Sequence, residues 1–305
     1  MPSVKFEGSI CALVTPFDAS GELDLSAFRK LLAWHAASGT QALVIGGSTG
    51  ESAALEESDF ERLVATAVAE RAGVRIIAGC GAGSTRKSLA MVRRAAALGA
   101  EAALVVTPYY VRPTQEGLVR HYLALADEGG LPLVPYNVPS RTGCDLQPET
   151  LARIATHERI VAIKEARPDA ERMAALLGLR SERFAVLSGD DPTALRAMRA
   201  GADGVISVAN NVVPRTFRAL CDAARGGRGD DAAALDAELA SLYAFLGAEP
   251  NPIPVKWLLH RMGRIGPALR LPLLELSAGL RGDAERLLAL VAAAERTPDP
   301  AASAA

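Results

Sequence analysis

Residues 75–106 read RIIAGCGAGSTRKSLAMVRRAAALGAEAALVV, and this stretch decides the fold. It opens with the apolar run Arg75–Ala78 and closes with the apolar run Ala102–Val106, and Ser84 stands before the helical pattern Thr85–Leu98 between them. Serine is a preferred helix N-cap. Because both runs are apolar throughout rather than alternating, they are typical of strands covered on both faces. The stretch therefore predicts a strand, a helix and a second, parallel strand.

The same unit recurs along the whole chain. Eight apolar runs are each followed by a segment with helical spacing, and they are Ile10–Val14, Ala42–Ile45, Arg75–Ala78, Ala102–Val106, Leu131–Pro135, Ile160–Ile163, Phe184–Leu187 and Gly204–Val208. Eight such units in regular order predict an α/β fold, a closed (β/α)8 TIM barrel. An open doubly wound sheet is the structural alternative, although it usually has fewer units.

Beyond the eighth unit the pattern becomes purely helical. The segment Gly226–Gly229 is a plausible boundary, and the helical patterns after it are Asp231–Leu246, Ile253–Met262 and Asp283–Ala294. We therefore predict a barrel domain over residues 1–227, a small C-terminal helical region over 228–296 and a disordered tail over 297–305.

Composition excludes several classes of protein. The 33 basic and 35 acidic side chains among 305 residues give a net charge of −2, without the basic excess of a nucleic-acid binder. No apolar run approaches the roughly 20 residues of a membrane-spanning helix, and we see no signal peptide. The four cysteines form no C-x-x-C pair, and neither they nor the scattered histidines indicate a metal site. We expect a cytoplasmic protein with reduced, buried thiols.

Polar residues at the carboxyl ends of the predicted strands are the candidates for chemistry, because active sites of these barrels lie on the loops after the strands. The candidates are Ser48 and Thr49 after the second run, Tyr110 after the fourth, Tyr136 and Arg141 after the fifth, Lys164 after the sixth, Gly189 after the seventh and Ile206 within the eighth.

Lys164 is the most informative of them. It closes an apolar run, and burial of a lysine lowers its pKa because desolvation disfavours the ammonium form. Only the neutral amine attacks a carbonyl, so such a lysine is suited to form a Schiff base. The alternative is a strand-end lysine that reaches solvent or pairs with Glu165.

Hydroxyl groups and one guanidinium accompany the lysine. Tyr136, Tyr110 and Thr49 could pass protons to and from an imine intermediate. Arg141 is suited to hold a substrate carboxylate with two hydrogen bonds. The alternatives are amphipathic rim residues for the tyrosines and a surface ion pair for the arginine.

Two glycine-rich segments lack the motifs of nucleotide binding. Gly46–Gly50 is not followed by Lys-Ser/Thr, so it is no P-loop. Gly79–Gly83 fails the G-x-G-x-x-G spacing because position 84 is serine.

With these motifs in view, the chain resembles the dihydrodipicolinate synthase family of pyruvate-dependent class I aldolases, a superfamily that includes N-acetylneuraminate lyase. The segments that carry the resemblance are Gly47–Ser52, Thr107–Gly117, Tyr136–Gly143, Ile163–Glu165, Ser188–Asp191, Gly204–Val208 and Asn251–Lys256. Serine at position 48 and Pro135 before Tyr136 depart from the usual residues. Proline cannot donate to a sheet ladder, which leaves the geometry at the end of that strand open.

The resemblance implies a role for each candidate. Lys164 forms a Schiff base with pyruvate, Tyr136 relays protons, and Thr49 links Tyr136 to a Tyr110 contributed across a dimer interface. Arg141 holds the carboxylate of aspartate 4-semialdehyde.

For the pyruvate end, the resemblance implies groups near Ser48, Thr49 and Ile206, with Gly189 nearby. It also implies a homodimer that pairs into a homotetramer, and no metal or organic cofactor. The implied reaction is condensation of pyruvate with aspartate 4-semialdehyde. The alternatives are another aldolase of the superfamily, acting on a sugar acid or hydroxy-keto acid, and a catalytically silent pyruvate-binding barrel.

Many family members are inhibited by lysine, and this chain departs from their inhibitor site. Glu57 and Phe60 stand where sensitive members carry histidines, and Gly83 and Lys87 stand where they carry asparagine and glutamate. Tyr109 remains. Because Lys87 would repel the ammonium group of the inhibitor, we predict little or no inhibition by millimolar lysine.

Overall fold

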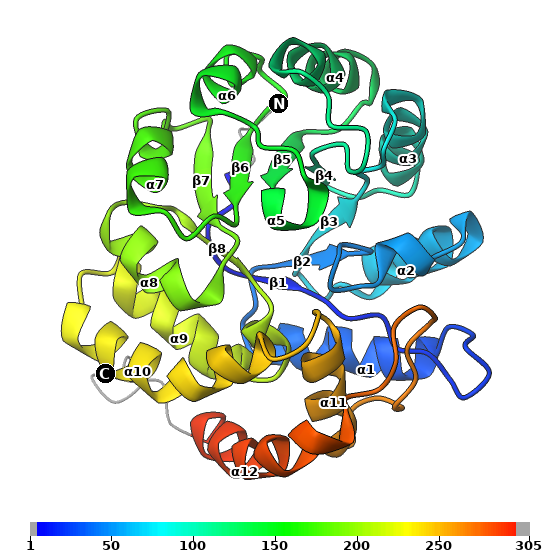
Figure 1. Ribbon diagram of the computed structural model, residues 1–305, viewed down its shortest axis with the longest axis vertical. Coiled ribbons are helices and arrows are strands. Elements are labelled where there is room, and N and C mark those ends of the chain that lie inside the picture. Colours follow the sequence, from blue (N-terminus) through cyan, green and yellow to red (C-terminus); the bar gives the residue numbers. More distant parts are fainter. Residues whose placement is uncertain (1–4, 297–305) are drawn as a thin grey trace.

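The predicted barrel is confirmed: a computed structural model, which describes residues 5–296, closes eight parallel strands into a ring in sequence order (Figure 1). The strands are β1 (Gly8–Ala12), β2 (Ala42–Ile45), β3 (Arg75–Gly79), β4 (Ala102–Val106), β5 (Leu133–Asn137), β6 (Ala162–Glu165), β7 (Ala185–Ser188) and β8 (Gly204–Ser207). The ring closes where Ile10 on β1 pairs with Ile206 on β8. An open sheet is therefore excluded.

Helices surround this ring. They are α1 (Leu25–Ala37), α2 (Glu57–Glu70), α3 (Thr85–Ala97), α4 (Gln115–Glu128), α5 (Pro139–Thr142), α6 (Pro148–Ile154), α7 (Ala170–Leu177), α8 (Asp191–Arg199) and α9 (Pro214–Arg225), with 3-10 turns at Ser52–Ala54 and Ala209–Asn211. Ser84 caps α3 as predicted, since its side chain accepts a hydrogen bond from the Lys87 N–H. None of the described helices is long and apolar enough to cross a bilayer.

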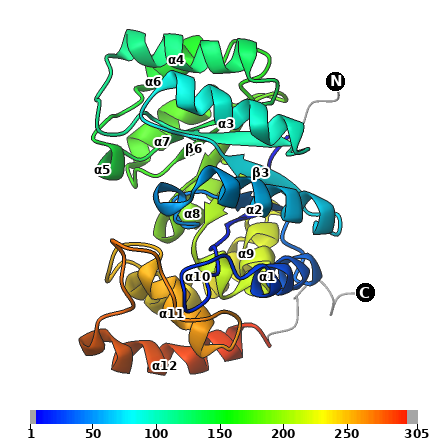
Figure 2. The ribbon, with the colours of Figure 1, turned by 90° about the vertical axis from the view of Figure 1, so that its right-hand side faces the viewer.

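The C-terminal helices follow the barrel. They are α10 (Gly229–Leu246), α11 (Ile253–Arg261) and α12 (Ala278–Ala294), and they gather on the side of the barrel where α1 and α9 lie (Figures 1 and 2). The predicted boundary at residues 227–228 stays a prediction. The tail predicted over 297–305 lies outside the described residues.

Two apolar layers follow from the alternation of side chains along each strand. One cluster fills the inside of the barrel and includes Ile10, Val44 and Leu104. The larger cluster lies between the strands and the helices and includes Leu43, Val105 and the inward faces of the helices. Alternate residues of one strand thus face opposite layers, so a single register decides which side chains enter the barrel.

Strand β6 breaks this alternation at one point. Val161 and Ala162 are consecutive, yet both belong to the cluster inside the barrel, whereas Ile160 and Ile163 belong to the outer one. Val161 donates its N–H to Leu133 on β5, but its carbonyl accepts from Ala185 on β7. The N–H and the carbonyl of this one residue therefore face opposite neighbouring strands, whereas in a regular strand both face the same one. This irregularity identifies a β-bulge.

The bulge shifts the register between β5 and β6 by one residue. Leu133 pairs with Ile160 below the bulge, and Tyr136 pairs with Lys164 above it. Without the shift Tyr136 would lie opposite Ile163, and Lys164 would face the helices. Pro135 lies in the interval where β5 and β6 change register, so its missing N–H falls where the ladder between these two strands is already interrupted.

Both strands also start and end two residues later than their apolar runs predict. The strands end later because their pairing continues through polar residues at the carboxyl end, where Asn137 pairs with Glu165. Their side chains satisfy each other, because the Asn137 amide donates to both carboxylate oxygens at 3.1 and 3.0 Å. Lys164 is therefore inside strand β6 rather than after it.

Candidate active site

Lys164 lies at the carboxyl end of the barrel with only 5% of its surface exposed. Burial, which disfavours the ammonium form, lowers its pKa to about 8, and the positive charge of Arg141 acts in the same direction. The carboxylate of Asp191 opposes both effects. Because the pKa falls well below that of a free lysine, a useful fraction of the amine is neutral near physiological pH.

The pairing of Lys164 with Glu165, considered above as an alternative, does not occur. Glu165 lies on the other face of β6, where its carboxylate accepts from Asn137 and from Arg172 Nε at 3.0 Å. Nζ of Lys164 instead lies 4.2 Å from the ring centroid of Tyr136. Among residues 5–296 no hydrogen bond to this amine is present, so it is available to a ligand.

Tyr136 faces Lys164 from the neighbouring strand. It is 7% exposed, and burial raises the pKa of its phenol to about 12. The phenol therefore carries its proton at neutral pH and can donate it. The register that aligns Tyr136 with Lys164 is the one set by the bulge in β6.

The loop after β2 supplies Ser48 and Thr49. Ser48 and Tyr136 line one small cavity at the barrel mouth, of about 20 Å³. The other residues that line it are Gly46, Gly47, Ser52, Gly79, Gly81, Leu104 and Val106. Small residues predominate there, which leaves room for a ligand of few atoms beside the phenol.

Thr49 is buried, and its hydroxyl Oγ1 accepts a hydrogen bond from Nδ2 of Asn251 at 2.9 Å. The contacts from Thr49 to Tyr136 and Tyr110 that the relay would need are absent from the described chain. Asn251 is therefore the side chain that engages this hydroxyl.

Arg141 lies on the short helix α5, which directly follows β5 at the carboxyl end of the barrel. Its guanidinium is exposed, and its Nη2 donates to the backbone carbonyl of Asn251 at 3.3 Å. Arg141 makes no ion pair within residues 5–296, so the surface ion pair considered as an alternative is absent there. The guanidinium remains open to an anion from solvent.

Gly189 and Ile206 complete the surroundings of Lys164. A Cβ atom at position 189 would lie 2.9 Å from Cε of Lys164, so a larger residue there would force the lysine side chain to shift. Ile206 is 1% exposed and belongs to the cluster inside the barrel together with Tyr136. The structure thus brings Lys164, Tyr136, Ser48, Gly189 and Ile206 to one end of the barrel.

Tyr110 stands apart from the others. It is 93% exposed and has a left-handed backbone, with a φ of 72°. The neighbouring Tyr109 and Val111 are also exposed, at 42% and 56%. Three consecutive large apolar side chains in solvent form an unusual tip, which we call the tyrosine tip, residues 109–111.

Three further residues around the site were not among the candidates predicted from the sequence. Asn251 engages Thr49 and Arg141, and Asp191 accepts N–H groups from Val208 and Ala209 while acting on the Lys164 pKa. Glu51 forms a fully buried pair with Lys256. All three lie in segments that carry the family resemblance, Gly47–Ser52, Ser188–Asp191 and Asn251–Lys256, and that was the signal available for them.

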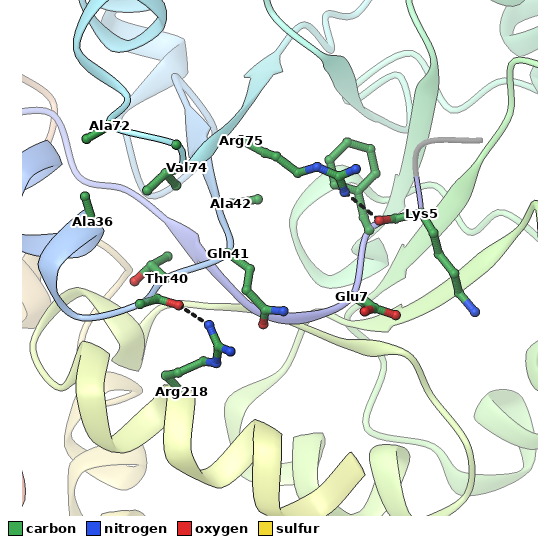
Figure 3. Close-up of a pocket in the computed structure, with 13 residues that line it drawn as sticks. Lys5, Glu7, Ala36, Thr40, Gln41, Ala42, Ala72, Val74, Arg75 and Arg218 are labelled. Atoms are coloured by element: carbon green, nitrogen blue, oxygen red, sulfur yellow. Dashed lines mark hydrogen bonds between the residues drawn. The ribbon is translucent and has the colours of Figure 1, made fainter. Parts of the chain in front are cut away.

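A wide hollow opens at the other end of the barrel, where the strands begin (Figure 3). It measures about 560 Å³ and includes Lys5, Arg75 and Arg218 in its lining. These cations are all engaged. Lys5 pairs with Asp203 at 2.9 Å, and the two arginines donate to the carbonyls of Lys5 and Gly39.

Lys87, Phe60 and Gly83, which the sequence predicts to depart from a lysine-inhibitor site, differ in their surroundings. Lys87 is exposed in the first turn of α3, while Phe60 is buried against the core. A Cβ atom at Gly83 would lie 3.3 Å from the Tyr109 carbonyl, so a side chain there would crowd the tyrosine tip.

The described part of the chain contains no group of three or more histidine, cysteine, aspartate or glutamate side chains arranged to hold a metal ion. The four cysteines are all buried and free, as the sequence predicts.

Comparison with known proteins places this site in context. The model of the dihydrodipicolinate synthetase family matches residues 5–290. The 4-hydroxy-tetrahydrodipicolinate synthase of Xanthomonas campestris is 55% identical over 96% of this chain and 97% of its own. The chloride-inhibited dihydrodipicolinate synthase from Acinetobacter baumannii, solved with pyruvate, is 42% identical, with a TM-score of 0.91 over 94% of this chain and 99% of its own. The enzyme from Cyanidioschyzon merolae, solved with lysine bound, is 34% identical, with a TM-score of 0.89 over 96% and 99%.

Proposed function

The chain belongs to the dihydrodipicolinate synthetase family, and from that premise we propose how its residues carry out the family's reaction. The protein is a lyase, a 4-hydroxy-tetrahydrodipicolinate synthase, which condenses pyruvate with aspartate 4-semialdehyde in the biosynthesis of lysine and diaminopimelate. The observation that carries the proposal is the buried amine of Lys164, with a pKa of about 8, facing the phenol of Tyr136.

Lys164 is the nucleophile in this proposal. Its neutral amine attacks the ketone carbon of pyruvate and forms a carbinolamine, whose hydroxyl leaves as water when it is protonated, giving the iminium. Loss of a methyl proton then gives the enamine, whose carbon attacks the aldehyde of the second substrate. The amino group of that substrate next attacks the iminium carbon, closes the ring and releases Lys164.

Tyr136 supplies the protons for these steps. Its pKa of about 12 keeps the phenol protonated at neutral pH, so it can donate to the departing hydroxyl and be reprotonated through Thr49. Tyr110 of a second subunit is the outer end of this relay. The exposure of the tyrosine tip supports that role, since a side chain 93% exposed in one chain is free to enter another.

Substrate binding is shared between the two sides of the mouth. We propose that Ser48, Thr49 and the backbone around Ile206 hold the pyruvate carboxylate and ketone, with Gly189 leaving room for the adduct on Lys164. Arg141 holds the carboxylate of aspartate 4-semialdehyde. Its exposed guanidinium, without an acidic partner among residues 5–296, supports this assignment.

The exposed tyrosine tip also supports a proposal for the assembly. We propose a homodimer in which tyrosine tips are exchanged, and a homotetramer formed from two such dimers. We further propose that no metal or organic cofactor takes part, because the covalent chemistry resides on Lys164, and that the enzyme works in the cytoplasm.

A steady-state assay tests the function. The purified enzyme is given pyruvate with aspartate 4-semialdehyde, and in parallel with sugar-derived aldehydes of similar length. Turnover that requires aspartate 4-semialdehyde supports the synthase. Turnover only with the sugar-derived aldehydes supports an aldolase of the wider superfamily, and trapping of pyruvate without any turnover supports the silent pyruvate-binding barrel.

A further inference from the structure

Asn251 lies where the C-terminal region touches the mouth of the barrel, just before α11. Its side chain donates from Nδ2 to Thr49 Oγ1 at 2.9 Å, and its backbone carbonyl accepts from Arg141 Nη2 at 3.3 Å. Thr49 and Arg141 are the residues proposed for the proton relay and for the second substrate. One residue, distant from both in the sequence, therefore contacts each of them.

The hydrogen bond to Thr49 has a direction. A threonine hydroxyl has one proton and two acceptor positions, and an amide nitrogen can only donate. Nδ2 of Asn251 therefore occupies one acceptor position of Oγ1 and leaves the hydroxyl proton for another group. A relay between two phenols needs both remaining functions of the Thr49 hydroxyl. The free acceptor position receives a proton from one phenol, and the hydroxyl proton is donated to the other.

The side chain of Asn251 makes no other hydrogen bond within residues 5–296. Its Oδ1 is buried and has no hydrogen-bond partner within residues 5–296. Thr49 is therefore the side chain that orients the amide in the described structure. A residue placed only to stabilise the turn would be expected to use both of its polar ends.

The segment that carries Asn251 is fixed to the same loop at a second point. Nζ of Lys256 donates to Glu51 at 2.5 Å and to the Thr15 carbonyl at 2.9 Å, and both members of the ion pair are 1% exposed. Glu51 lies two residues after Thr49, and its second oxygen accepts from the Arg270 N–H at 3.0 Å. The distance between Asn251 and Thr49 is thus held by a buried ion pair beside it.

We propose that Asn251 is a positioning residue of the condensation reaction: its amide sets the direction in which the Thr49 hydroxyl donates, and its carbonyl steadies Arg141. The proposal rests on the function given above. It assigns to the C-terminal region a part in catalysis beyond covering the barrel.

Two substitutions at position 251 distinguish the direction of the hydrogen bond to Thr49 from the shape of the side chain. Asn251→Ala removes the donor, and we expect kcat to fall about tenfold, the loss typical of one hydrogen bond, with the KM for pyruvate changed less than about twofold. Asn251→Asp keeps the shape but replaces the donor with an acceptor, which draws the Thr49 proton away from the relay. We expect its kcat to be at least as low as that of Asn251→Ala. A purely structural role predicts the reverse order, because aspartate is the conservative replacement.

A double-mutant cycle with Thr49→Val tests the route of the effect. If Asn251 acts through Thr49, adding Asn251→Ala to Thr49→Val lowers kcat by less than about twofold, whereas independent effects would multiply. Circular dichroism and the thermal midpoint verify that each variant folds. If Asn251→Ala does not fold, the near-isosteric Asn251→Asp completes the cycle.

The wild-type enzyme is measured first, so that the proposed condensation reaction and the proposed role of Asn251 can be tested separately. Absence of condensation by the wild type overturns the proposed function. Condensation by the wild type together with a kcat for Asn251→Ala within about twofold of it, or with multiplicative losses in the cycle, overturns only the role of Asn251.

Discussion

The two ends of the barrel differ in what burial does to charge. At the amino end, a hollow of about 560 Å³ contains three cations, and each is matched by a carboxylate or a backbone carbonyl. At the carboxyl end, Lys164 is 5% exposed and makes no ion pair within residues 5–296. Its amine lies over the ring of Tyr136, which lines a cavity of only about 20 Å³. The cations around the larger space are therefore paired, whereas Lys164 at the opposite end has a lowered pKa.

The difference teaches where reactivity is located in this fold. A paired cation keeps its proton and its bonds, so it can stabilise the barrel but cannot attack a carbonyl. A lysine desolvated among apolar residues loses part of its affinity for the proton and becomes a nucleophile. Cavity size is a poor guide here, whereas an unpaired buried charge is a good one.

The sharpest test of the comparison exchanges a lysine at each end for alanine. Lys164→Ala should abolish turnover and the adduct that borohydride traps with pyruvate, because it removes the only proposed nucleophile. Lys5→Ala, the matched control at the amino end, should keep both. Mass spectrometry of the trapped peptide gives the readout, and an adduct on a lysine other than Lys164 would contradict the mechanism.

Tyr136→Phe is expected to have the next largest effect. It keeps the ring beside Lys164 but removes the phenolic proton, and loss of a general acid–base group lowers kcat by about 10²- to 10⁴-fold. Single-turnover measurements should show slow adduct formation with pyruvate. A kcat near that of the wild type would mean that protons reach the carbinolamine by another route.

Arg141→Ala should discriminate between the substrates. Loss of a charge-assisted contact to a carboxylate is expected to raise the KM for aspartate 4-semialdehyde by about 30-fold or more, while the KM for pyruvate changes little. Initial rates over a grid of both substrates measure the two constants. Equal, small changes in both would reopen the aldolase alternative.

The pH dependence of adduct formation should follow the Lys164 pKa of about 8. Only the neutral amine reacts, so the rate rises with pH up to that value and then levels off. Between pH 8 and pH 7 we expect a fall of about fivefold, and a further fall of nearly tenfold by pH 6. A rate still rising tenfold per unit above pH 9 would show that the lysine is not desolvated in solution.

The smallest effect is expected at Gly83 and Lys87, where the family resemblance implies a site for the inhibitor lysine. The exposed Lys87 would repel the ammonium of the inhibitor, and Gly83 offers no side chain to hold it, so millimolar lysine should leave activity nearly unchanged. An activity titration at low pyruvate measures this. Half-inhibition below about 1 mM, equivalent to binding worth about 4 kcal/mol, would contradict the expectation.

The eight units could be predicted from the sequence because strands covered on both faces must be apolar throughout, as Ala102–Val106 is. The carboxyl-end rule then placed Lys164, Tyr136 and Gly189 together. The bulge at Val161 was not predictable, because Ile-Val-Ala-Ile is apolar in either register. Nor was the contact of Asn251 with Thr49, which joins residues 202 apart and depends on how the C-terminal helices dock.

The bulge in β6 has a consequence for how this enzyme can evolve. Substitutions among Ile160, Val161, Ala162 and Ile163 change volume, and neighbouring side chains can adjust to that. A deletion or insertion of one residue in the same segment would instead move every following side chain to the other face of the strand. Lys164 and its outward-facing neighbour would then exchange positions. The segment Ile160–Ile163 can therefore vary in composition but is fixed in length, and divergent relatives that keep the chemistry should align through it without gaps.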